Sequence, residues 1–407
     1  MEAELAVWLY GDLVALITQE RRLRLKYTVE ALAKYELGFP LLSLALPLRT
    51  ERYTHLPVGA FLDGLLPEGE ARRALSRDLS LRADDTFGLI RALGRDCAGA
   101  IVIQPADDPA PPHATTYSAR QLSDAEIADL VANLREAPLG AGGRVRISLA
   151  GIQEKLLLTC MADGSWGQPV DGTPSTHILK PQIDRYPKTV ENELFCMRLA
   201  KQLGLPVADV DIMTVFGRKL IMVERFDRVV HENGSVDRIH QEDFCQATSF
   251  PPAQKYEEDG GPPLKRVADI LQVAASSDAI DDLLRAVTLN VIIGNGDAHA
   301  KNFSLLHDQV GAVRLAPLYD IMSTLIYGDD RLAMYIDSVQ RIDRVTTARI
   351  INEATRWGMS RRRATEIVRD LLKRVPDGIA AAELETPDVP TELLQIVSDQ
   401  LSRLDSE

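Results

Sequence analysis

The stretch Gly294-Asn-Gly-Asp-Ala-His-Ala-Lys-Asn-Phe303 constrains this chain more than any other part of its sequence. Within it, Asp297 and Asn302 stand five residues apart, and a second acid, Asp320, follows Asn302 by eighteen residues. Phosphoryl transfer from ATP needs one carboxylate that orients the attacking hydroxyl, and an Asn and an Asp that hold the metal ion on the phosphates. The spacing therefore predicts Asp297 as the catalytic residue, and Asn302 and Asp320 as magnesium ligands.

Two further side chains of this stretch are candidates for contacts with the nucleotide, and each has an alternative. His299 gives the pattern Asp-x-His-x-x-Asn, which also occurs in small-molecule kinases of the aminoglycoside and choline type. A histidine at this place more often orients the loop through hydrogen bonds. Lys301 either touches the transferred phosphate or is simply solvated. The protein-kinase loop H-R-D-x-x-x-x-N shares the Asp-to-Asn spacing, so the chain is interpreted as a kinase.

Composition and charge bear on the nucleic-acid contacts, the redox environment and the location that we expect for this chain. The 407 residues carry a net charge of −13, which disfavours a broad surface for nucleic-acid phosphates. The four cysteines lie far apart without a C-x-x-C pair, as expected of reduced, mostly buried thiols in a cytosol. Met1 begins no basic and apolar leader, and no apolar run of about 18 residues occurs. We therefore expect a cytoplasmic protein with no membrane segment.

The first half of the chain has mainly strand signals. Residues 6–10 and 13–18 are expected to pair as strands around a Gly11-Asp12 turn. A proline-rich break follows at 104–112, and Ser123 and Glu126 predict a capping box that begins a helix over 123–135. Other segments are also predicted: strands at 176–180, 211–215 and 219–223, and helices at 71–76 and 189–203.

The second half is predominantly helical by its apolar spacing. It predicts helices at 281–293, two within 345–375 and one at 393–404, with a strand at 313–318. This order predicts an α+β, bilobal, protein-kinase-like fold with a mostly-β N-lobe, an extra amino-terminal α+β subdomain and an all-α C-lobe. The expected ranges are 1–105 for the amino-terminal subdomain, 106–228 for the N-lobe with its phosphate loop, and 229–407 for the helical C-lobe with the catalytic loop.

Candidate nucleotide-binding residues lie before the catalytic stretch. Lys180 ends a predicted strand, where it would neutralise the α- and β-phosphates, although such a lysine by itself is usually a solvated edge residue. Glu191 or Glu193 on the following helix would orient it, and the sequence does not decide between them. A glycine-rich stretch from residue 140 leads to Ser148–Lys155, whose backbone N–H groups could surround phosphates. Phe226 suits either an adenine contact or a structural role.

Seven stretches in order, together with residues 64–73, resemble the HipA family of serine/threonine-protein kinase toxins over nearly the whole chain. They include Val223-Glu-Arg-Phe-Asp-Arg228 and Lys255-Tyr-Glu-Glu-Asp-Gly-Gly261. The others are residues 147–155, 176–180, 191–193, 241–243 and 296–303.

The resemblance implies a toxin of a type II toxin–antitoxin pair that phosphorylates a protein on Ser or Thr with ATP and Mg²⁺. It also implies an aminoacyl-tRNA synthetase as substrate, such as glutamyl-tRNA synthetase, so that growth is arrested and persistence promoted. The implied partner is a small helix-turn-helix antitoxin, HipB, through which operator DNA is mainly contacted.

The resemblance also assigns roles to residues. It makes Asp297 catalytic, Asn302 and Asp320 metal ligands, and Lys180 the phosphate lysine. It places adenine contacts at Glu224 and Phe226, and autophosphorylation at Ser148. The phosphate loop that it implies consists of Ala150, Gly151, Ile152, Gln153, Glu154 and Lys155.

A phosphate on Ser148 adds a charge of about −1.5 to −2 beside a loop that would hold ATP phosphates. We expect it to oppose nucleotide binding, either by repulsion or by drawing the loop toward Arg144 and Arg146. Two alternatives to the toxin kinase are a small-molecule kinase and a corepressor subunit of a DNA-bound antitoxin complex.

Overall fold

The computed structural model describes residues 3–111, 119–140, 146–276 and 278–406. The chain divides into two units by its internal contacts. The first unit contains Met1–Pro181, Met213–Pro252 and His307–Gly311, and the second contains Gln182–Ile212, Ala253–Leu306 and Ala312–Glu407. The three ranges expected from the sequence, 1–105, 106–228 and 229–407, were drawn around the predicted sites and not from contacts. They stay a prediction.

The first unit begins with a four-stranded antiparallel sheet in the order β3-β2-β1-β4. Its first hairpin joins β1 (Glu4–Leu9) and β2 (Asp12–Gln19) as the Gly11-Asp12 turn predicted, and β1 also pairs with β4. The remaining elements are β3 (Leu23–Tyr27), β4 (Ile101–Pro105), α1 (Val29–Lys34), α2 (His55–Leu65), α3 (Gly69–Asp78) and α4 (Thr86–Leu93). The short helix predicted at 71–76 is therefore confirmed and lies within α3.

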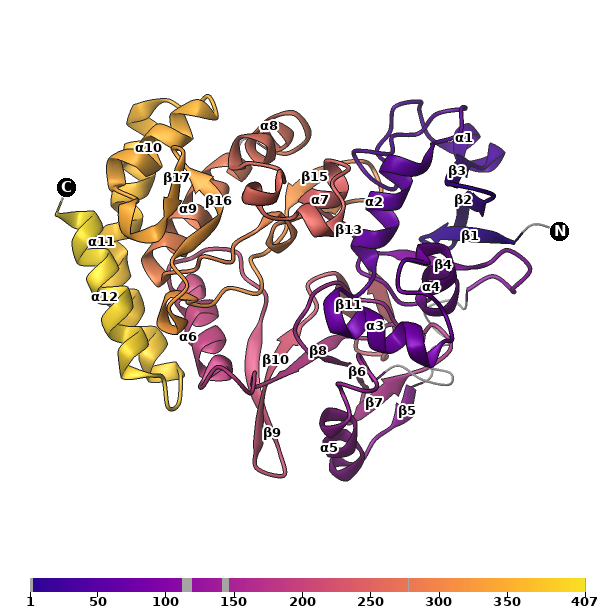
Figure 1. Ribbon diagram of the computed structural model, residues 1–407, viewed down its shortest axis with the longest axis horizontal. Coiled ribbons are helices and arrows are strands. Elements are labelled where there is room, and N and C mark those ends of the chain that lie inside the picture. Colours follow the sequence, from indigo (N-terminus) through magenta and orange to yellow (C-terminus); the bar gives the residue numbers. More distant parts are fainter. Residues whose placement is uncertain (1–2, 112–118, 141–145, 277, 407) are drawn as a thin grey trace. The chain divides into compact units, whose positions relative to one another are not determined.

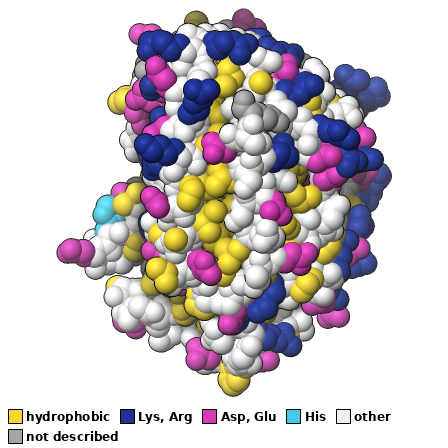
Figure 2. Space-filling view, turned by 90° about the vertical axis from the view of Figure 1, so that its left-hand side faces the viewer, with side chains coloured by type: hydrophobic (Ala, Val, Ile, Leu, Met, Phe, Trp, Pro, Cys, Tyr) yellow, Lys and Arg dark blue, Asp and Glu magenta, His cyan; other side chains and the backbone are white. Residues whose placement is uncertain are grey.

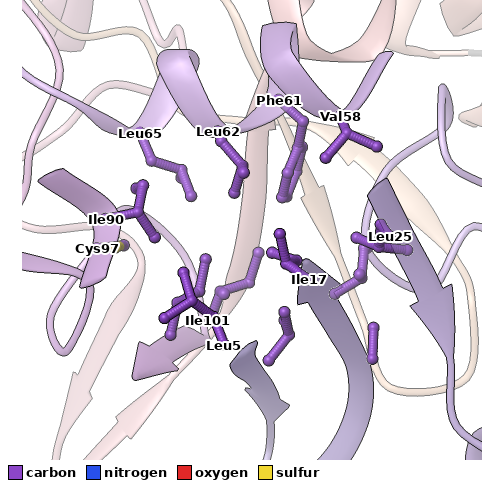
Figure 3. Close-up of a cluster of buried hydrophobic side chains, with 14 of the residues drawn as sticks. Leu5, Ile17, Leu25, Val58, Phe61, Leu62, Leu65, Ile90, Cys97 and Ile101 are labelled. Carbon is purple, nitrogen blue, oxygen red and sulfur yellow. The ribbon is translucent and has the colours of Figure 1, made fainter. Parts of the chain in front are cut away.

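The core of this part lies between one face of the sheet and the helices α2 and α4. Alternate strand residues such as Leu5, Ile17 and Ile101 point toward Phe61 and Leu62 of α2, as Figure 3 shows. All five side chains are essentially inaccessible to solvent. Complete burial of such a side chain stabilises a fold by about 1.5–3 kcal/mol relative to exposure, so this cluster is a main source of stability for the unit.

A second, six-stranded sheet of this unit has the order β5-β7-β6-β8-β10-β9. Its strands are β5 (Ala119–Gln121), β6 (Leu156–Cys160), β7 (Trp166–Pro169), β8 (His177–Pro181), β9 (Val210–Val215) and β10 (Arg218–Glu224). The helix α5 (Asp124–Ala132) shares a buried cluster with it that includes Ile127, Leu158 and Leu179. The predicted capping box of Ser123 and Glu126 is present, and the helix ends three residues earlier than expected.

Short elements complete the unit after this sheet. They are β11 (Arg228–Val230), β12 (Val236–Arg238), β13 (His240–Asp243) and α7 (Phe244–Ala247). The Gln246 side chain of α7 donates a hydrogen bond to the Phe61 carbonyl of α2, at 2.9 Å.

The second unit is mainly helical, as predicted, but the expected all-α C-lobe was wrong, because short strands also form there. Its helices are α6 (Thr189–Gln202), α8 (Leu264–Ala274), α9 (Asp278–Ile293), α10 (Thr347–Arg356), α11 (Arg361–Glu385) and α12 (Thr391–Asp405). This part of the chain also contains short strands. The strand β15 (Val313–Leu315) lies within the predicted range 313–318, whereas three others were not predicted: β14 (Ser304–His307), β16 (Arg331–Ile336) and β17 (Val339–Arg341).

The long helix α11 contacts α6, α9, α10 and α12, and α12 lies beside it in Figure 1. A Cβ atom at Gly378 would lie 3.1 Å from Leu199 and Leu203 of α6, so the absent side chain allows the two helices to approach closely. The predicted helix ended at residue 375, which was wrong: α11 continues through Pro376 to Glu385. The buried residues Val375, Gly378 and Ala382 continue one apolar face past the proline, which explains why the helix does not end there.

The surface on the side of α11 and α12 carries charges of both signs around apolar patches, as Figure 2 shows. Three of the four cysteines are buried and Cys160 is partly buried, in line with the expected burial. In the parts of the chain that the structure describes, every helix is too short or too polar to cross a bilayer.

Candidate active site

The loop that carries Asp297 begins where α9 ends, in the second unit. The Asn295 amide donates a hydrogen bond to the Asn290 side chain of α9, at 2.9 Å, and its oxygen accepts from the Asp297 N–H at 3.1 Å. On the other side, the Ala333 N–H of β16 donates to the Gly296 carbonyl at 2.8 Å. These three hydrogen bonds hold the backbone at and immediately before Asp297, so this carboxylate stands on a fixed loop.

The Asp297 side chain reaches solvent, and the Tyr256 hydroxyl donates a 2.7 Å hydrogen bond to its Oδ1 atom. Desolvation by the surrounding protein raises the pKa of Asp297 to about 6. The bond from Tyr256 opposes this shift, whereas the nearby Asp320 charge adds to it. A carboxylate with a pKa near neutrality is ionised at pH 7 and is a better proton acceptor than an ordinary aspartate.

Asn302 and Asp320 are direct neighbours. The Asn302 side-chain amide donates to the backbone carbonyl of Asp320 at 3.3 Å. The Tyr319 hydroxyl donates to the Lys301 carbonyl at 2.6 Å and so fixes the two segments a second time. Asp320 itself has a φ of +56°, a left-handed conformation that non-glycine residues adopt rarely and often at functional sites. The structure thus gathers Asp297, Asn302 and Asp320 in one region of the second unit.

The two candidates between them, His299 and Lys301, are both buried. Desolvation, followed by the charge of Lys255, lowers the pKa of His299 to about 3, so its ring is neutral. Its Nδ1 atom has no hydrogen-bond partner among the described residues, and the ring packs edge-on against Tyr256 with 5.2 Å between ring centres. The loop is oriented instead by the His299 carbonyl, which accepts from the Asn302 N–H at 2.9 Å. Lys301 is not the solvated residue of the alternative interpretation.

A magnesium ion fits the chemistry of Asn302 and Asp320. Magnesium prefers oxygen ligands in octahedral geometry and commonly combines one or two protein groups with phosphate oxygens and water. Across the described residues, no three His, Cys, Asp or Glu side chains converge as a cation site. The amide oxygen of Asn302 and the carboxylate of Asp320 are oxygen donors that could fill two positions of a magnesium shell completed by phosphate oxygens and water.

The predicted phosphate loop lies in the first unit, where Ser148 is fully buried. Its N–H donates to the Asp96 carbonyl at 2.9 Å, and its hydroxyl donates to the Leu65 carbonyl, at the end of α2, at 2.7 Å. Ile147 forms a parallel bridge with the same Asp96. The predicted glycines 142 and 143, and Arg144, lie outside the described residues.

Beyond Ser148 the loop folds back on itself. The Lys155 ammonium donates to the Ala150 carbonyl at 2.7 Å, and the Glu68 N–H donates to the Gly151 carbonyl at 3.2 Å. Gly151 has a φ of +115°, and a Cβ atom there would lie 2.4 Å from the Lys155 Nζ atom. The loop therefore needs glycine at 151 for two independent reasons.

Of the other loop residues, Ile152 is exposed, whereas Gln153 and Glu154 are partly buried. Ile152 is 58% exposed, which leaves a large apolar side chain at the tip of the loop. Gln153 donates to the Pro181 carbonyl of β8 at 3.4 Å, and Glu154 forms an ion pair with Arg135 at 2.9 Å. These two contacts fix the flanks of the loop.

The remaining nucleotide candidates of this unit lie on β8 and after β10. Lys180 is a buried residue of β8 that pairs with Ile221 of β10, so it is not a solvated edge lysine. Glu224 ends β10 with an exposed side chain, and Phe226 is partly buried. Arg225 is buried, so Glu224 and Arg225 face in opposite directions.

Glu191 and Glu193, the two candidate partners of Lys180, lie on α6 on either side of Asn192. Glu191 and Glu193 are both buried, and Glu191 lies 3.4 Å from the ammonium of Lys188. Asn192 between them exchanges two hydrogen bonds with the backbone of Ser323, at 2.8 and 2.9 Å. It thereby fixes the segment that follows Asp320. Which glutamate pairs with Lys180 stays a prediction.

Sequence reasoning assigned no role to Tyr256, Asn295 or Asn192. Tyr256 lies 41 positions from Asp297, so no local pattern signals their contact. The signal for Asn295 was present, since an Asn-Gly-Asp turn favours side-chain bonds to its own backbone. Asn192 lies between Glu191 and Glu193, and these two acids were the residues considered as partners of Lys180.

The chain is similar to two family models and to several known proteins. Residues 147–379 match the model of the HipA-like C-terminal domain, and residues 5–104 match that of the HipA N-terminal domain. The serine/threonine-protein kinase toxin HipA of Shewanella oneidensis is 33% identical over 386 residues, which cover 90% of this chain and 86% of that protein. A Sinorhizobium fredii protein named Putative kinase Y4mE is 41% identical over 341 residues, covering 82% of this chain and 80% of that protein.

A solved structure agrees with these relatives. A chain in the complex of the Shewanella oneidensis toxin–antitoxin system HipA, HipB and its operator DNA matches with a TM-score of 0.83 and 29% identity. The match covers 99% of this chain and 96% of that chain. The chain therefore belongs to the HipA family and has its protein-kinase-like fold.

Proposed function

We propose that this protein is an ATP- and Mg²⁺-dependent serine/threonine-protein kinase and the toxin of a HipB-type toxin–antitoxin pair. The observation that carries the proposal is the exposed carboxylate of Asp297 on a fixed loop, with Asn302 and Asp320 held against each other nearby. The name of the Shewanella oneidensis relative, a serine/threonine-protein kinase toxin, supports the same activity.

The residues of the second unit perform the transfer in this proposal. Bound ATP and Mg²⁺ supply an electrophilic γ-phosphate whose charge the metal partly neutralises. Asp297 accepts a hydrogen bond from the acceptor hydroxyl and takes its proton. Because Tyr256 occupies Oδ1, we assign the acceptor hydroxyl to Oδ2. Asn302 and Asp320, the latter in a left-handed backbone conformation, would hold the metal.

The residues of the first unit bind the nucleotide. Backbone N–H groups of Ala150–Lys155 would bind the phosphates, and Lys180 would neutralise their charge. Glu224 is assigned to the adenine through its backbone and Phe226 to the face of the ring. Lys155 keeps the loop closed through its bond to Ala150.

Autophosphorylation at Ser148 would inactivate the protein. The hydroxyl is fully buried and bonded to Leu65, so it must leave this position before it can receive a phosphate. Return of the segment would then bury a group with a charge of about −1.5 to −2, which is strongly unfavourable without paired cations. The loop would consequently stay open and bind ATP poorly. Arg146, which is exposed, is a candidate partner for the phosphate.

A HipB-type antitoxin is the proposed partner, because a structural relative was solved with HipB and operator DNA. The net charge of −13 favours DNA contact mainly through the antitoxin. A corepressor role in that complex is compatible with kinase activity. An aminoacyl-tRNA synthetase as phosphorylated protein stays a prediction from the resemblance.

Transfer of label from ATP tests the proposal. The protein is incubated with γ-³²P-ATP and Mg²⁺, alone and with a bacterial lysate separated into protein and small-molecule fractions. We expect label on Ser148 and on a lysate protein, and a Ser148→Ala variant should lose the first and keep the second. A Ser398→Ala variant on α12 is the matched control and should keep both. Label confined to small molecules would instead support the small-molecule kinase, and no label at all would contradict both.

A further inference from the structure

Asp96, which follows α4 in the amino-terminal domain, lies at the centre of a fully buried charge network within the first unit. One of its carboxylate oxygens lies 2.9 Å from Arg228 and 3.2 Å from Arg238. The other accepts hydrogen bonds from Ser175, from the N–H at 2.9 Å and from the hydroxyl at 2.7 Å. Arg225 lies 3.6 Å away. A carboxylate this deeply buried is tolerated only because cations and donors surround it.

The backbone on either side of Asp96 contributes to the same network. The Cys97 carbonyl accepts from Arg225 at 3.0 Å and from Arg228 at 2.8 Å. The Gly99 N–H donates to the carboxylate of Asp227 at 2.7 Å, which in turn pairs with Arg225 at 2.8 Å. Residues 96–99 thus contact every buried charge of the stretch 225–228.

The two proposed adenine contacts are Glu224, directly before this stretch, and Phe226 within it. Arg225, Asp227 and Arg228 are at most 5% exposed, whereas Glu224 is exposed and Phe226 only partly buried. The buried members of the stretch are therefore held by Asp96 and its neighbours, while Glu224 and Phe226 keep more of their surface accessible.

Asp96 also holds the other proposed nucleotide segment. Its carbonyl accepts the Ser148 N–H at 2.9 Å, next to the bridge between Asp96 and Ile147. One residue of the amino-terminal domain therefore contacts both the beginning of the phosphate loop and, through the arginines, the Glu224–Phe226 segment.

We propose that Asp96 is a positioning residue of the nucleotide site, which sets the phosphate loop through its carbonyl and the adenine segment through its carboxylate. The amino-terminal domain is then part of the ATP-binding apparatus of this chain. The expected change in nucleotide affinity rests on the proposed kinase function. The expected change in local hydrogen exchange rests only on the contacts described above.

The test compares Asp96→Asn with the full-length protein. The amide keeps the size of the side chain and loses its charge, so the three arginines face a single buried carboxylate, that of Asp227. We expect the dissociation constant for Mg²⁺ and a non-hydrolysable ATP analogue to rise at least about tenfold, since small misplacements of binding groups are costly. We also expect amide hydrogen exchange to accelerate in 147–151 and 224–228, while α5 of the same unit keeps its protection.

The matched control is Asp84→Asn, which removes an exposed aspartate that pairs with Arg82 in the same domain. Both readouts should stay at the wild-type values in this variant. If Asp96→Asn does not fold, Ser175→Ala removes one donor to Asp96 and one acceptor of Arg225, and smaller shifts in the same two segments are expected.

Unchanged exchange in both segments, or equal acceleration throughout the unit, would overturn the proposal. If the wild-type protein binds no nucleotide, the proposed kinase function fails, and the exchange pattern still decides whether Asp96 positions the two segments.

Discussion

The carboxylate of Asp297 differs from that of an ordinary surface aspartate because a tyrosine hydroxyl fixes one of its oxygens. The same tyrosine packs against His299, whose ring is neutral and buried. The orientation of this carboxylate thus comes from an aromatic residue that lies 41 positions away in the chain. In the proposed mechanism this leaves the second oxygen for the acceptor.

Tyr256→Phe should therefore lower kcat by about tenfold, the usual effect of losing a hydrogen bond to a charged group. The KM for ATP should stay close to that of the wild type, because the substitution removes only the hydroxyl that bonds to Asp297 and keeps the ring that packs against His299. Steady-state kinetics with saturating acceptor measure both constants. A rise in KM with an unchanged kcat would show that Tyr256 acts on nucleotide binding instead.

At the scale of single elements, the proposed phosphate loop depends on the backbone conformation of Gly151. Gly151→Ala would impose strain at a φ of +115° and place a methyl group on the Lys155 ammonium. We expect affinity for an ATP analogue to fall about tenfold, measured by calorimetry. Gly164→Ala is the matched control, because Gly164 also has a positive φ but has open space around it. Equal affinities of the two variants would contradict the account of the loop.

The contact between α6 and α11 depends on a missing side chain. Gly378→Leu should destabilise the protein by about 1–3 kcal/mol, the usual result of overpacking, because Leu199 and Leu203 already lie 3.1 Å from the Cβ position. The midpoint of urea-induced unfolding reports the loss. Ala380→Leu, at an exposed position of the same helix, should change it by no more than about 0.5 kcal/mol. Equal effects at both positions would refute the close packing.

Local signals account for the elements that the sequence could predict. The Gly11-Asp12 turn between alternating apolar residues predicts the β1–β2 hairpin, and Ser123 with Glu126 predicts the start of α5. The strands β14, β16 and β17 are short and have no alternating pattern, so their pairing depends on distant partners. Pro376 is a stop signal that the buried face of α11 overrides.

The spacing of Asp297, Asn302 and Asp320 likewise predicted the candidate residues of the site, whose roles are proposals. Asn302 and Asp320 lie together as their pattern suggested. The contacts of Tyr256 with Asp297, and of Asp96 with Arg225 and Arg228, join segments far apart in the chain. Only the folded structure brings such partners together, so a single sequence holds no signal for them.

At the scale of the whole molecule, buried groups make stability depend on pH. Desolvation lowers the pKa of His177 to about 4, of His240 to about 3 and of His299 to about 3. The unfolded chain, with histidine near pKa 6.5, binds three protons that the folded state refuses, so stability falls as the pH drops below 6.5. Asp297, with its raised pKa of about 6, opposes this with one proton between pH 6 and about 4.

Because three protons outweigh one, we expect the free energy of unfolding to decrease steadily from pH 6.5 to 4.5, measured by chemical unfolding. The variant His177→Gln should lower the slope by about 1.4 kcal/mol per pH unit, the value for one proton. A slope identical to that of the wild type would show that His177 is protonated in the folded protein.

The central claim is that the Asp297 carboxylate, beside two groups that would bind a metal ion, takes the proton of a protein hydroxyl as that hydroxyl receives phosphate from ATP. The most direct measurement compares wild-type protein with Asp297→Asn for phosphate transfer and for affinity toward Mg²⁺ and an ATP analogue, with Asp399→Asn on α12 as control. We predict that Asp297→Asn loses about 10²–10⁴-fold of the transfer rate, that its nucleotide affinity changes little, and that the control keeps both. Transfer at the wild-type rate by Asp297→Asn would contradict the account.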